Sequence, residues 1–495
     1  MTSVVSYNPR TGEPVGEPIP ATDPDQVDAV VAAAAAAAPA WAAMGGRARA
    51  AALDAIADAL DTAADELVAL ADAETALGDA RLHGEIDRTT GQLRMFAGIV
   101  HEGSYVEAII TPADPAAMRP DVRRMLAPIG PVAVFAASNF PFAFSVAGGD
   151  TASALAAGCP VVVKAHENHP RTSARVAEVL ASALRSTGTP NGVCGLVFGV
   201  EAGRRLVTHP GVRAVGFTGS TAAGRALFDL ASRRPHPIPF YGELGSVNPV
   251  VILPSAARSR AQDLAAGYAA SLTLGTGQFC TNPGIVFAPA EPDLLAAIRV
   301  AISSSRGGPM LTRRMHDSYL AAANNAAWAD RELLARGHAD GIWAAAPEVR
   351  TVSISEFAGD LDQLTQERFG PAGLVVTYHR LEDLLAVLAA LPGSLTATIH
   401  ATGDELDAVR AVADTLAPIA GRLIMNGWPT GVAVCWAMHH GGPWPATTNP
   451  SHTSVGSAAT RRWLAPIAYQ DWPDPLLPPA LQAGNPLQIT RLTQD

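Results

Sequence analysis

The feature that most constrains this chain is an alternation of short apolar runs with helical segments, which begins near residue 130. Short apolar runs bounded by turn residues are typical of buried strands. They occur at 130–138, 161–165, 195–200 and 212–218. Segments with helical periodicity, at 144–157, 170–184 and 221–231, lie between or after them. Strands separated by helices in this way form βαβ units, so we predict a parallel sheet in this region.

The alternation starts again in the second half of the chain. Further strands are predicted at 248–254, 374–379, 395–401 and 421–426, with helices at 381–391 and 404–417. A chain of 495 residues is long enough for two or three domains. We therefore predict an α/β fold with two parallel-sheet domains.

Residues 23–100 are predicted to be helical instead. Asp23 followed by Pro24 and Gln26 has the pattern of a capping box. The uncharged run 29–46 is mostly alanine, which is too weakly apolar to predict a membrane span.

Charge and cysteine content narrow the function classes. The net charge is −11 and only 16% of the residues are charged, so no nucleic-acid or membrane partner is expected, since either needs a basic face. The four cysteines are scattered, as in a reducing compartment, and the N-terminus lacks the pattern of a signal peptide. We expect a cytoplasmic protein.

Cys280 lies in a segment rich in turn residues, GQFCTNPG (277–284). A reactive thiol needs access and nearby backbone donors, which such a loop offers. The alternative is a buried structural cysteine, which is the interpretation that fits Cys159, Cys194 and Cys435.

Two further polar residues follow predicted strands. Glu243, in YGELGSVNP (241–249), is either a partly desolvated general base or an ordinary solvated carboxylate. Asn139, in SNFPF (138–142), either donates its amide to an oxyanion or caps the next helix.

A ligand that carries phosphate is suggested at the end of the strand 212–218. Gly219 and Ser220, in GFTGS (216–220), leave free backbone N–H groups at a helix N-terminus, although no GxGxxG turn is present. Lys164, the single lysine among 35 basic residues, ends another strand, where parallel sheets bind ligands.

Two other patterns have plainer alternatives. Glu367, in ERFGP (367–371), either binds a ribose or is a solvated loop carboxylate. His166 and His169 have the spacing of metal ligands, but no further ligand is near in sequence, so no metal is expected.

Taken in order, six motifs closely resemble the aldehyde dehydrogenase superfamily over essentially the whole chain: SNFPF, VVVKAHENHP, GFTGS, ELGSVNP, GQFCTNPG and ERFGP. The segments 426–432, 440–456 and 476–487 are similar to one branch of it. That branch contains α-ketoglutaric semialdehyde (2,5-dioxovalerate) dehydrogenases and NADP-linked fatty-aldehyde enzymes.

The resemblance implies roles for these residues. Cys280 would be the nucleophile, Asn139 an oxyanion donor and Glu243 the base that activates water for thioester hydrolysis. The implied cofactor is NAD or NADP, and the implied cofactor-binding residues are Lys164, Glu167, Gly219, Ser220, Glu367 and Phe369. Phe140 would line the aldehyde tunnel.

Glu167 bears on the choice of cofactor, because it resembles a ribose-binding carboxylate of NAD-preferring relatives. Such a carboxylate would repel the 2′-phosphate of NADP, so we expect a preference for NAD. Arg204 and Arg205 could offset that repulsion.

The resemblance also implies an architecture. A cofactor-binding domain would comprise 1–105 and 130–245, and a catalytic domain 246–440. An oligomerisation element would comprise 106–129 and 470–495, with 441–469 as a return segment at the domain interface. A homodimer or homotetramer is expected.

The expected reaction is oxidation of 2,5-dioxovalerate to 2-oxoglutarate. This substrate needs an arginine or backbone donors in the tunnel, and the sequence singles out no arginine. A medium- or long-chain fatty aldehyde is the alternative, with Trp428, Trp436 and Trp444 lining an apolar tunnel. A CoA-acylating enzyme would not need Glu243, and an inactive binding protein would not need the three catalytic candidates together.

Overall fold

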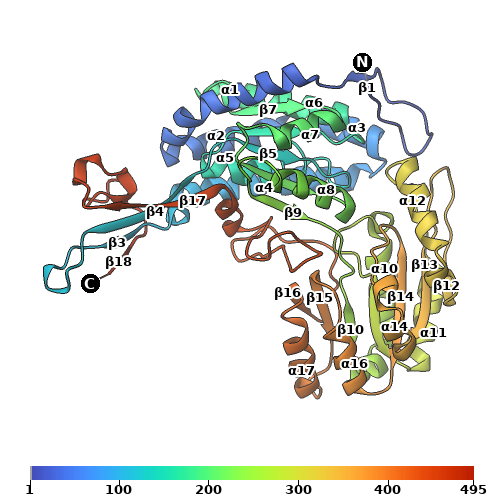
Figure 1. The fold of residues 1–495 in the computed structure, drawn as a ribbon. Helices are drawn as coiled ribbons and strands as arrows, with labels where there is room; N and C mark the ends of the chain where they lie inside the picture. The colour runs from blue at the N-terminus through green and yellow to red at the C-terminus, as the bar shows by residue number, and fades with distance from the viewer. Residues whose placement is uncertain (1–2, 495) are drawn as a thin grey trace.

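Five parallel strands form the sheet of the first domain, in the order β7-β6-β5-β8-β9 (Figure 1). The computed structural model describes residues 3–494. Chain order reverses on either side of β5, so a crevice opens at the carboxyl ends of β5, β6 and β8, where parallel sheets bind ligands. The strands are β5 (Val132–Phe135), β6 (Val161–Lys164), β7 (Cys194–Val197), β8 (Ala214–Thr218) and β9 (Phe240–Glu243).

Helices cover both faces of this sheet, because alternate residues of each strand point to opposite sides. Val132 and Val134 pack toward the helices α2, α5 and α6, whereas Ala133 and Phe135 pack toward α1, α7 and α8. The helices are α1 (Pro24–Ala43), α2 (Gly46–Thr62), α3 (Ala64–Thr75), α4 (Asp79–Glu102), α5 (Gly149–Ala157), α6 (Pro170–Ser186), α7 (Val200–Thr208) and α8 (Thr221–Ser232).

The capping box predicted at the start of α1 is confirmed. Asp23 accepts a hydrogen bond from the Gln26 backbone N–H at 2.8 Å, and the Gln26 side chain accepts one from the Asp23 N–H at 3.0 Å. By length and composition alone α1 could cross a membrane. Its residues Val27 and Val31 are fully buried in the same apolar cluster as β6, β7 and α7.

The helix predicted at 144–157 begins later, at Gly149. Residues 141–148 form turns instead, because the buried carboxylate of Glu85 on α4 accepts the backbone N–H groups of Phe142 (2.8 Å) and Ala143 (3.0 Å). This contact fixes the segment that follows Asn139.

The second domain contains a seven-stranded sheet, in the order β12-β13-β14-β11-β10-β15-β16, which is parallel except for β12 (Figure 1). The strands are β10 (Val250–Ile252), β11 (Ile285–Pro289), β12 (Glu332–Arg336), β13 (Glu348–Ser353), β14 (Ala372–Tyr378), β15 (Ser394–His400) and β16 (Ala420–Met425). Helices α9–α11 pack on one face and α12–α17 on the other. They are α9 (Pro254–Ser259), α10 (Ala261–Thr273), α11 (Pro292–Ser303), α12 (Arg313–Ala323), α13 (Ala326–Ala329), α14 (Ile354–Gly359), α15 (Leu361–Leu364), α16 (Leu381–Leu388) and α17 (Leu406–Leu416).

An arm of four strands projects from the first domain and carries the C-terminal end of the chain (Figure 1). Its order is β17-β4-β3-β18, and β4 pairs with both β17 and β3 in antiparallel fashion. The strands are β3 (Ile109–Thr111), β4 (Val122–Pro128), β17 (Leu464–Gln470) and β18 (Leu492–Thr493). The pairing with β4 therefore begins at Leu464, before the boundary at 470 expected from the sequence. Near the N-terminus, β1 (Ser3–Val4) and β2 (Ile19–Pro20) form a small separate ladder.

The N-terminus of α6, which follows the loop after Lys164, is held by the fully buried Glu74. Its carboxylate accepts hydrogen bonds from the Thr172 hydroxyl (2.7 Å), the backbone N–H groups of Thr172 (2.8 Å) and Arg171 (3.1 Å), and the Ser6 hydroxyl (2.6 Å). A buried anion at a helix N-terminus satisfies backbone donors and complements the helix dipole.

We predict that Glu74→Gln lowers the free energy of unfolding by about 2–3 kcal/mol. In this variant the NH₂ group of the amide would point at N–H and O–H groups that now donate hydrogen bonds to the Glu74 carboxylate. Urea titration followed by circular dichroism would measure this. Glu178→Gln, on the exposed side of α6, is the matched control and should leave the stability almost unchanged. Equal stability of the two variants would contradict the role given to Glu74.

Candidate active site

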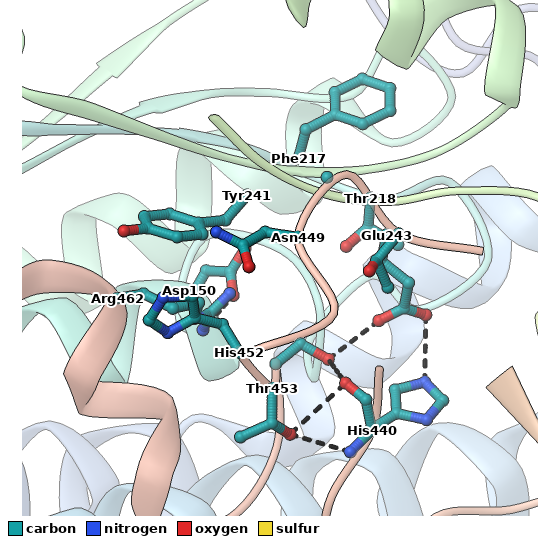
Figure 2. A pocket seen from close by; sticks show the side chains of 13 residues that line it. Asp150, Phe217, Thr218, Tyr241, Glu243, His440, Asn449, His452, Thr453 and Arg462 are labelled. Carbon is teal, nitrogen blue, oxygen red and sulfur yellow. Dashed lines mark hydrogen bonds and ion pairs between the residues drawn. The ribbon is translucent and has the colours of Figure 1, made fainter. Parts of the chain in front are cut away.

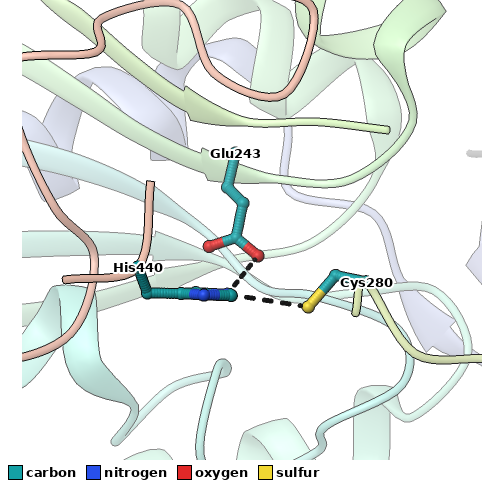
Figure 3. Close-up of side chains that lie close together, drawn as sticks. All are labelled: Glu243, Cys280 and His440. Carbon is teal, nitrogen blue, oxygen red and sulfur yellow. Dashed lines mark hydrogen bonds and ion pairs between the residues drawn. The ribbon is translucent and has the colours of Figure 1, made fainter. Parts of the chain in front are cut away.

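Three reactive side chains that are distant in sequence meet at one point (Figure 3). Glu243 ends β9, Cys280 lies before β11, and His440 belongs to the coil after β16. A carboxylate oxygen of Glu243, Sγ of Cys280 and a ring nitrogen of His440 all lie within 4.8 Å of one another. Nε2 of His440 is 3.0 Å from Oε1 of Glu243 and 3.7 Å from Sγ of Cys280. One imidazole nitrogen therefore links the thiol to the carboxylate.

Glu243 is buried, which excludes the alternative of a solvated carboxylate at a strand end. The hydroxyl of Ser454 donates a hydrogen bond to Oε2 of Glu243 at 2.8 Å. A small pocket lies beside the Glu243 carboxylate (Figure 2). Burial raises the pKa of Glu243, but the contacts with His440, Ser454 and Cys280 more than offset this and lower the pKa below its usual value. Glu243 is thus an ionised acceptor at neutral pH.

The loop that carries Cys280 depends on left-handed backbone. Gly275, Thr276 and Gly277 all have positive φ, and a Cβ on Gly277 would lie 2.3 Å from the backbone of Gly370. Burial, followed by the charge of Glu243, raises the pKa of Cys280 well above its usual value. The resting group is therefore a thiol, which needs a proton acceptor before it can attack.

Two asparagine amides hold this loop in place. Nδ2 of Asn248 donates to the carbonyl oxygens of Cys280 (2.8 Å) and Asn282 (2.9 Å). Nδ2 of Asn282 donates to those of Gly277 (2.9 Å) and Gly370 (3.0 Å). The nucleophile is thus fixed through its own backbone.

The structure places Asn139 against the same loop. Its Nδ2 donates to the carbonyl oxygen of Gln278 at 2.9 Å, and its own backbone carbonyl accepts from Arg81 at 2.7 Å. A primary amide has two N–H donors, so a second one is available beside Cys280. The sequence alternative, a cap for the next helix, does not apply, since α5 begins only at Gly149 and is capped by Gly148.

A cleft of about 680 Å³ runs from Cys280 across the carboxyl ends of β5, β6 and β8. Of the residues singled out in the sequence, it is lined by Asn139, Lys164, Glu167, Gly219, Ser220, Cys280, Glu367 and Phe369. Glu243 and Phe140 do not line it. Glu243 instead borders the smaller pocket, next to His440.

Charged groups are concentrated at the end of the cleft near β6. Lys164 pairs with Glu167, and burial lowers the pKa of Lys164. Arg204 lines the cleft, as does Arg314 from α12, which the sequence analysis did not single out. Arg205 does not; it pairs with Asp28 at 2.6 Å.

Glu367 lies at the other part of the cleft, near Cys280. Burial raises its pKa to about 7, and the backbone N–H of Ser246 donates to it at 3.4 Å. It is therefore not the solvated loop carboxylate that the sequence left open. His169, in contrast, has a structural role, because its two ring nitrogens contact the Ala137 carbonyl (2.9 Å) and the Ser173 hydroxyl (3.2 Å).

Phenylalanines lie beside the reactive loop, whereas the three tryptophans suggested for a fatty-aldehyde tunnel have other surroundings. Phe140 packs edge-on against Phe144 and Phe279, each with ring centroids 5.3 Å apart. Trp428 instead stacks on Tyr268 of α10, where Gly267 leaves room for it. The other two tryptophans proposed for the tunnel are about half exposed: Trp436 and Trp444.

Sequence reasoning missed His440 and Ser454 as partners of Glu243. Both lie in the segment 440–456, which was noted only for its resemblance to one branch of the family. The adjacent pair His439 and His440 was the available signal, but it carries no spacing that points to Glu243, which is 197 residues away.

Comparisons with known proteins agree with this geometry. Residues 2–443 match the aldehyde dehydrogenase family. The chain is 47% identical to alpha-ketoglutaric semialdehyde dehydrogenase 2 of Azospirillum brasilense, over 98% of this chain and 95% of that protein. It is 42% identical to alpha-ketoglutaric semialdehyde dehydrogenase of Acinetobacter baylyi, over 83% of this chain and 80% of that protein.

Solved structures share the fold. PnpE in complex with nicotinamide adenine dinucleotide superposes with a TM-score of 0.81 at 24% identity, covering 95% of this chain and 94% of that one. Aldehyde dehydrogenase C of Pseudomonas syringae, as a variant with NAD⁺ and octanal, gives 0.80 at 21% identity, covering 94% and 93%. The resemblance seen in the six motifs and the predicted α/β fold are thus confirmed, and the chain belongs to the aldehyde dehydrogenase family.

Proposed function

We propose that this chain oxidises 2,5-dioxovalerate to 2-oxoglutarate with NAD(P), through a covalent intermediate on Cys280. The observation that carries the proposal is the contact of one His440 nitrogen with both the Cys280 thiol and the Glu243 carboxylate, next to the cleft. The substrate is suggested by the names of the two relatives from Azospirillum and Acinetobacter. The structural neighbour that holds nicotinamide adenine dinucleotide supports the cofactor.

The first step removes the thiol proton. Cys280 has a raised pKa and Glu243 a lowered one, so the proton leaves Sγ only as the thiolate attacks and is received by the group formed by His440 and Glu243. The Sγ–C bond forms as the aldehyde oxygen becomes an oxyanion. The free N–H of Asn139 and the backbone N–H of Cys280 then stabilise the thiohemiacetal oxyanion.

The cleft fits a nicotinamide dinucleotide in size and in donor set. Ser220 caps α8, whose first N–H groups suit a pyrophosphate. The ribose-binding residues would be Lys164 and Glu167 on one side and Glu367 with Phe369 on the other. Bound NAD(P) supplies the hydride acceptor that converts the thiohemiacetal to a thioester.

Hydrolysis then requires a base. Once the thiol proton of the first step has passed to solvent, Glu243 takes a proton from a water molecule and the hydroxyl adds to the thioester carbon. The C–S bond then breaks, the thiolate takes that proton back from Glu243 to restore the Cys280 thiol, and the acid product loses its own proton to solvent and leaves as the carboxylate. The side chain of Glu243 borders the small polar pocket next to His440, whereas it does not line the cofactor cleft.

We also propose a homodimer or homotetramer formed through the arm, in the cytoplasm. Large apolar side chains are exposed on the arm, and association would remove them from water: Met118, Ile467, Leu476 and Leu492. The four cysteines are free, as in a reducing compartment.

The function is tested by following reduced nicotinamide with 2,5-dioxovalerate, glutaraldehyde and a long-chain aldehyde, each with NAD and NADP. We predict the highest kcat/KM for 2,5-dioxovalerate and no turnover in Cys280→Ala, because the covalent step needs the thiol. Cys159→Ala, a buried cysteine away from the site, is the control and should remain active. A higher kcat/KM for the long-chain aldehyde would favour the fatty-aldehyde alternative.

We predict that Glu243→Gln lowers the pKa of Cys280, because the variant removes a negative charge that opposes thiolate formation. The midpoint pH of Cys280 alkylation by iodoacetamide, read by mass spectrometry, should therefore fall. Steady-state turnover should drop roughly 10²- to 10⁴-fold, since the general base for hydrolysis is lost. An unchanged or higher midpoint would contradict the electrostatic coupling of the two groups.

We predict that wild type prefers NAD and that Glu167→Ser raises kcat/KM for NADP by about 10-fold or more, because it removes a repulsive carboxylate and frees Lys164 to meet a 2′-phosphate. The values of kcat/KM for NAD and for NADP are measured at a fixed aldehyde concentration and compared. Glu178→Gln is the control of equal charge change outside the cleft. Equal use of both cofactors by wild type and variant would show that Glu167 does not discriminate between them.

A further inference from the structure

Arg81, Arg88 and Arg422 are three of the arginines near the reactive loop, and two of these three already donate to backbone carbonyls. Arg81 donates to the Asn139 carbonyl at 2.7 Å. Arg422 of β16 donates to the carbonyls of Pro429 (3.1 Å) and Gly431 (3.2 Å), which holds the coil before His440. These two guanidiniums therefore act on the protein itself.

The third arginine, Arg88 on α4, does not donate to a backbone carbonyl in this way. Within residues 3–494, neither its Nε nor its Nη2 has a hydrogen-bond partner, although both atoms are shielded from solvent. Its Cζ lies 5.2 Å from the centroid of the Phe144 ring and 5.8 Å from that of Phe140. A buried guanidinium without acceptors is costly, so such a group in a protein interior indicates an anionic ligand.

Arg88 is also close to the reacting groups. Phe140, over which it lies, follows Asn139 in the chain and packs on Phe279, the neighbour of Cys280. The charges of Cys280 and Glu243 act on Arg88, and Arg88 in turn favours the Cys280 thiolate. Arg88 therefore lies against the aromatic cluster that packs on the reactive loop.

Glu85, on the same helix, acts on Arg88 through its charge but forms no salt bridge with it in the described residues. Glu85 already accepts the backbone N–H groups of Phe142 and Ala143 through Oε1. Burial raises the pKa of Glu85, which favours its neutral form. Arg88 therefore keeps its capacity for a second, soluble anion.

We propose that Arg88 binds the carboxylate of the substrate and so selects semialdehydes of short dicarboxylic acids over uncharged aldehydes. This inference rests on the proposed function and names the residue that would give the site its substrate class. An arginine fork binds a carboxylate through two parallel N–H···O bonds, which a lysine cannot reproduce. In an extended five-carbon substrate the carboxylate lies about 5 Å from the aldehyde carbon, which is the span that a substrate held by both Cys280 and Arg88 would bridge.

The test compares two aldehydes that differ only at the far end, 5-oxopentanoate and pentanal. Arg88→Met keeps the length and apolar stem but removes the fork. We expect the ratio of kcat/KM for 5-oxopentanoate to kcat/KM for pentanal to fall roughly 10- to 100-fold, mainly through KM for 5-oxopentanoate. A smaller loss shared by both aldehydes would reflect the effect of the Arg88 charge on the Cys280 thiolate. Pentanal turnover also shows that the variant is folded. Arg88→Lys should recover only part of the loss, because an ammonium binds as a single point charge.

Arg94→Met is the matched control, since Arg94 lies on the same helix but pairs with Asp58 and Asp61 at the surface. It should leave both substrates unaffected. Equal losses for the two aldehydes in Arg88→Met, or no loss for either, would overturn the role of Arg88. Failure of the proposed function is distinct, because wild type itself would then not oxidise aldehydes or would not prefer 5-oxopentanoate to pentanal.

Discussion

The reactive loop depends on the fully buried amide of Asn248, which lies between the last strand of the first sheet and the first strand of the second. Its Nδ2 holds the carbonyls of Cys280 and Asn282, while its Oδ1 accepts from the hydroxyls of Ser246 (2.8 Å) and Thr396 (3.1 Å). One side chain therefore joins the domain linker, the cysteine loop and β15. Both polar atoms of this amide have hydrogen-bond partners, so a displaced loop would leave buried polar groups without partners. The free-energy cost of those lost hydrogen bonds keeps the Cys280 thiol in its position.

The site places opposing electrostatic demands on two neighbouring groups. The Cys280 thiol is buried next to an anion, which keeps it protonated and protected until a substrate and a base are in place. Glu243 stays ionised because His440 and Ser454 compensate for its burial. His440 contacts both groups through one nitrogen, so the proton can pass over a short path without exposing either group to bulk water. Glu243 borders the smaller pocket, which shares Phe217 and Thr218 with the main cleft.

Local sequence predicted the elements whose signals are local. The capping box at Asp23, the buried strands β5, β6 and β8, and the helix that Ser220 caps all follow from residues within a few positions of one another. The start of α5 was misplaced because the distant Glu85 captures the N–H groups of residues 142 and 143. The strands β11, β12 and β13 were not predicted, and neither were the helices α11, α12 and α13 that lie between β11 and β12. The position of Trp428 depends on the space above Gly267.

The sequence by itself determined the fold class, the family and the candidates for the thiol, the carboxylate and the cofactor-binding residues. Each of these lies in a short motif, where residue type and neighbours carry the information. Only the tertiary structure decided which side chains tune that chemistry. His440 reaches Glu243 across 197 residues of chain, and Arg88 stands out because two of its buried nitrogens have no hydrogen-bond partner in the described residues, whereas the other buried arginines have at most one such nitrogen. The physical reason is that pKa values and binding specificity depend on burial and on distances between charges, and packing of the two domains sets both.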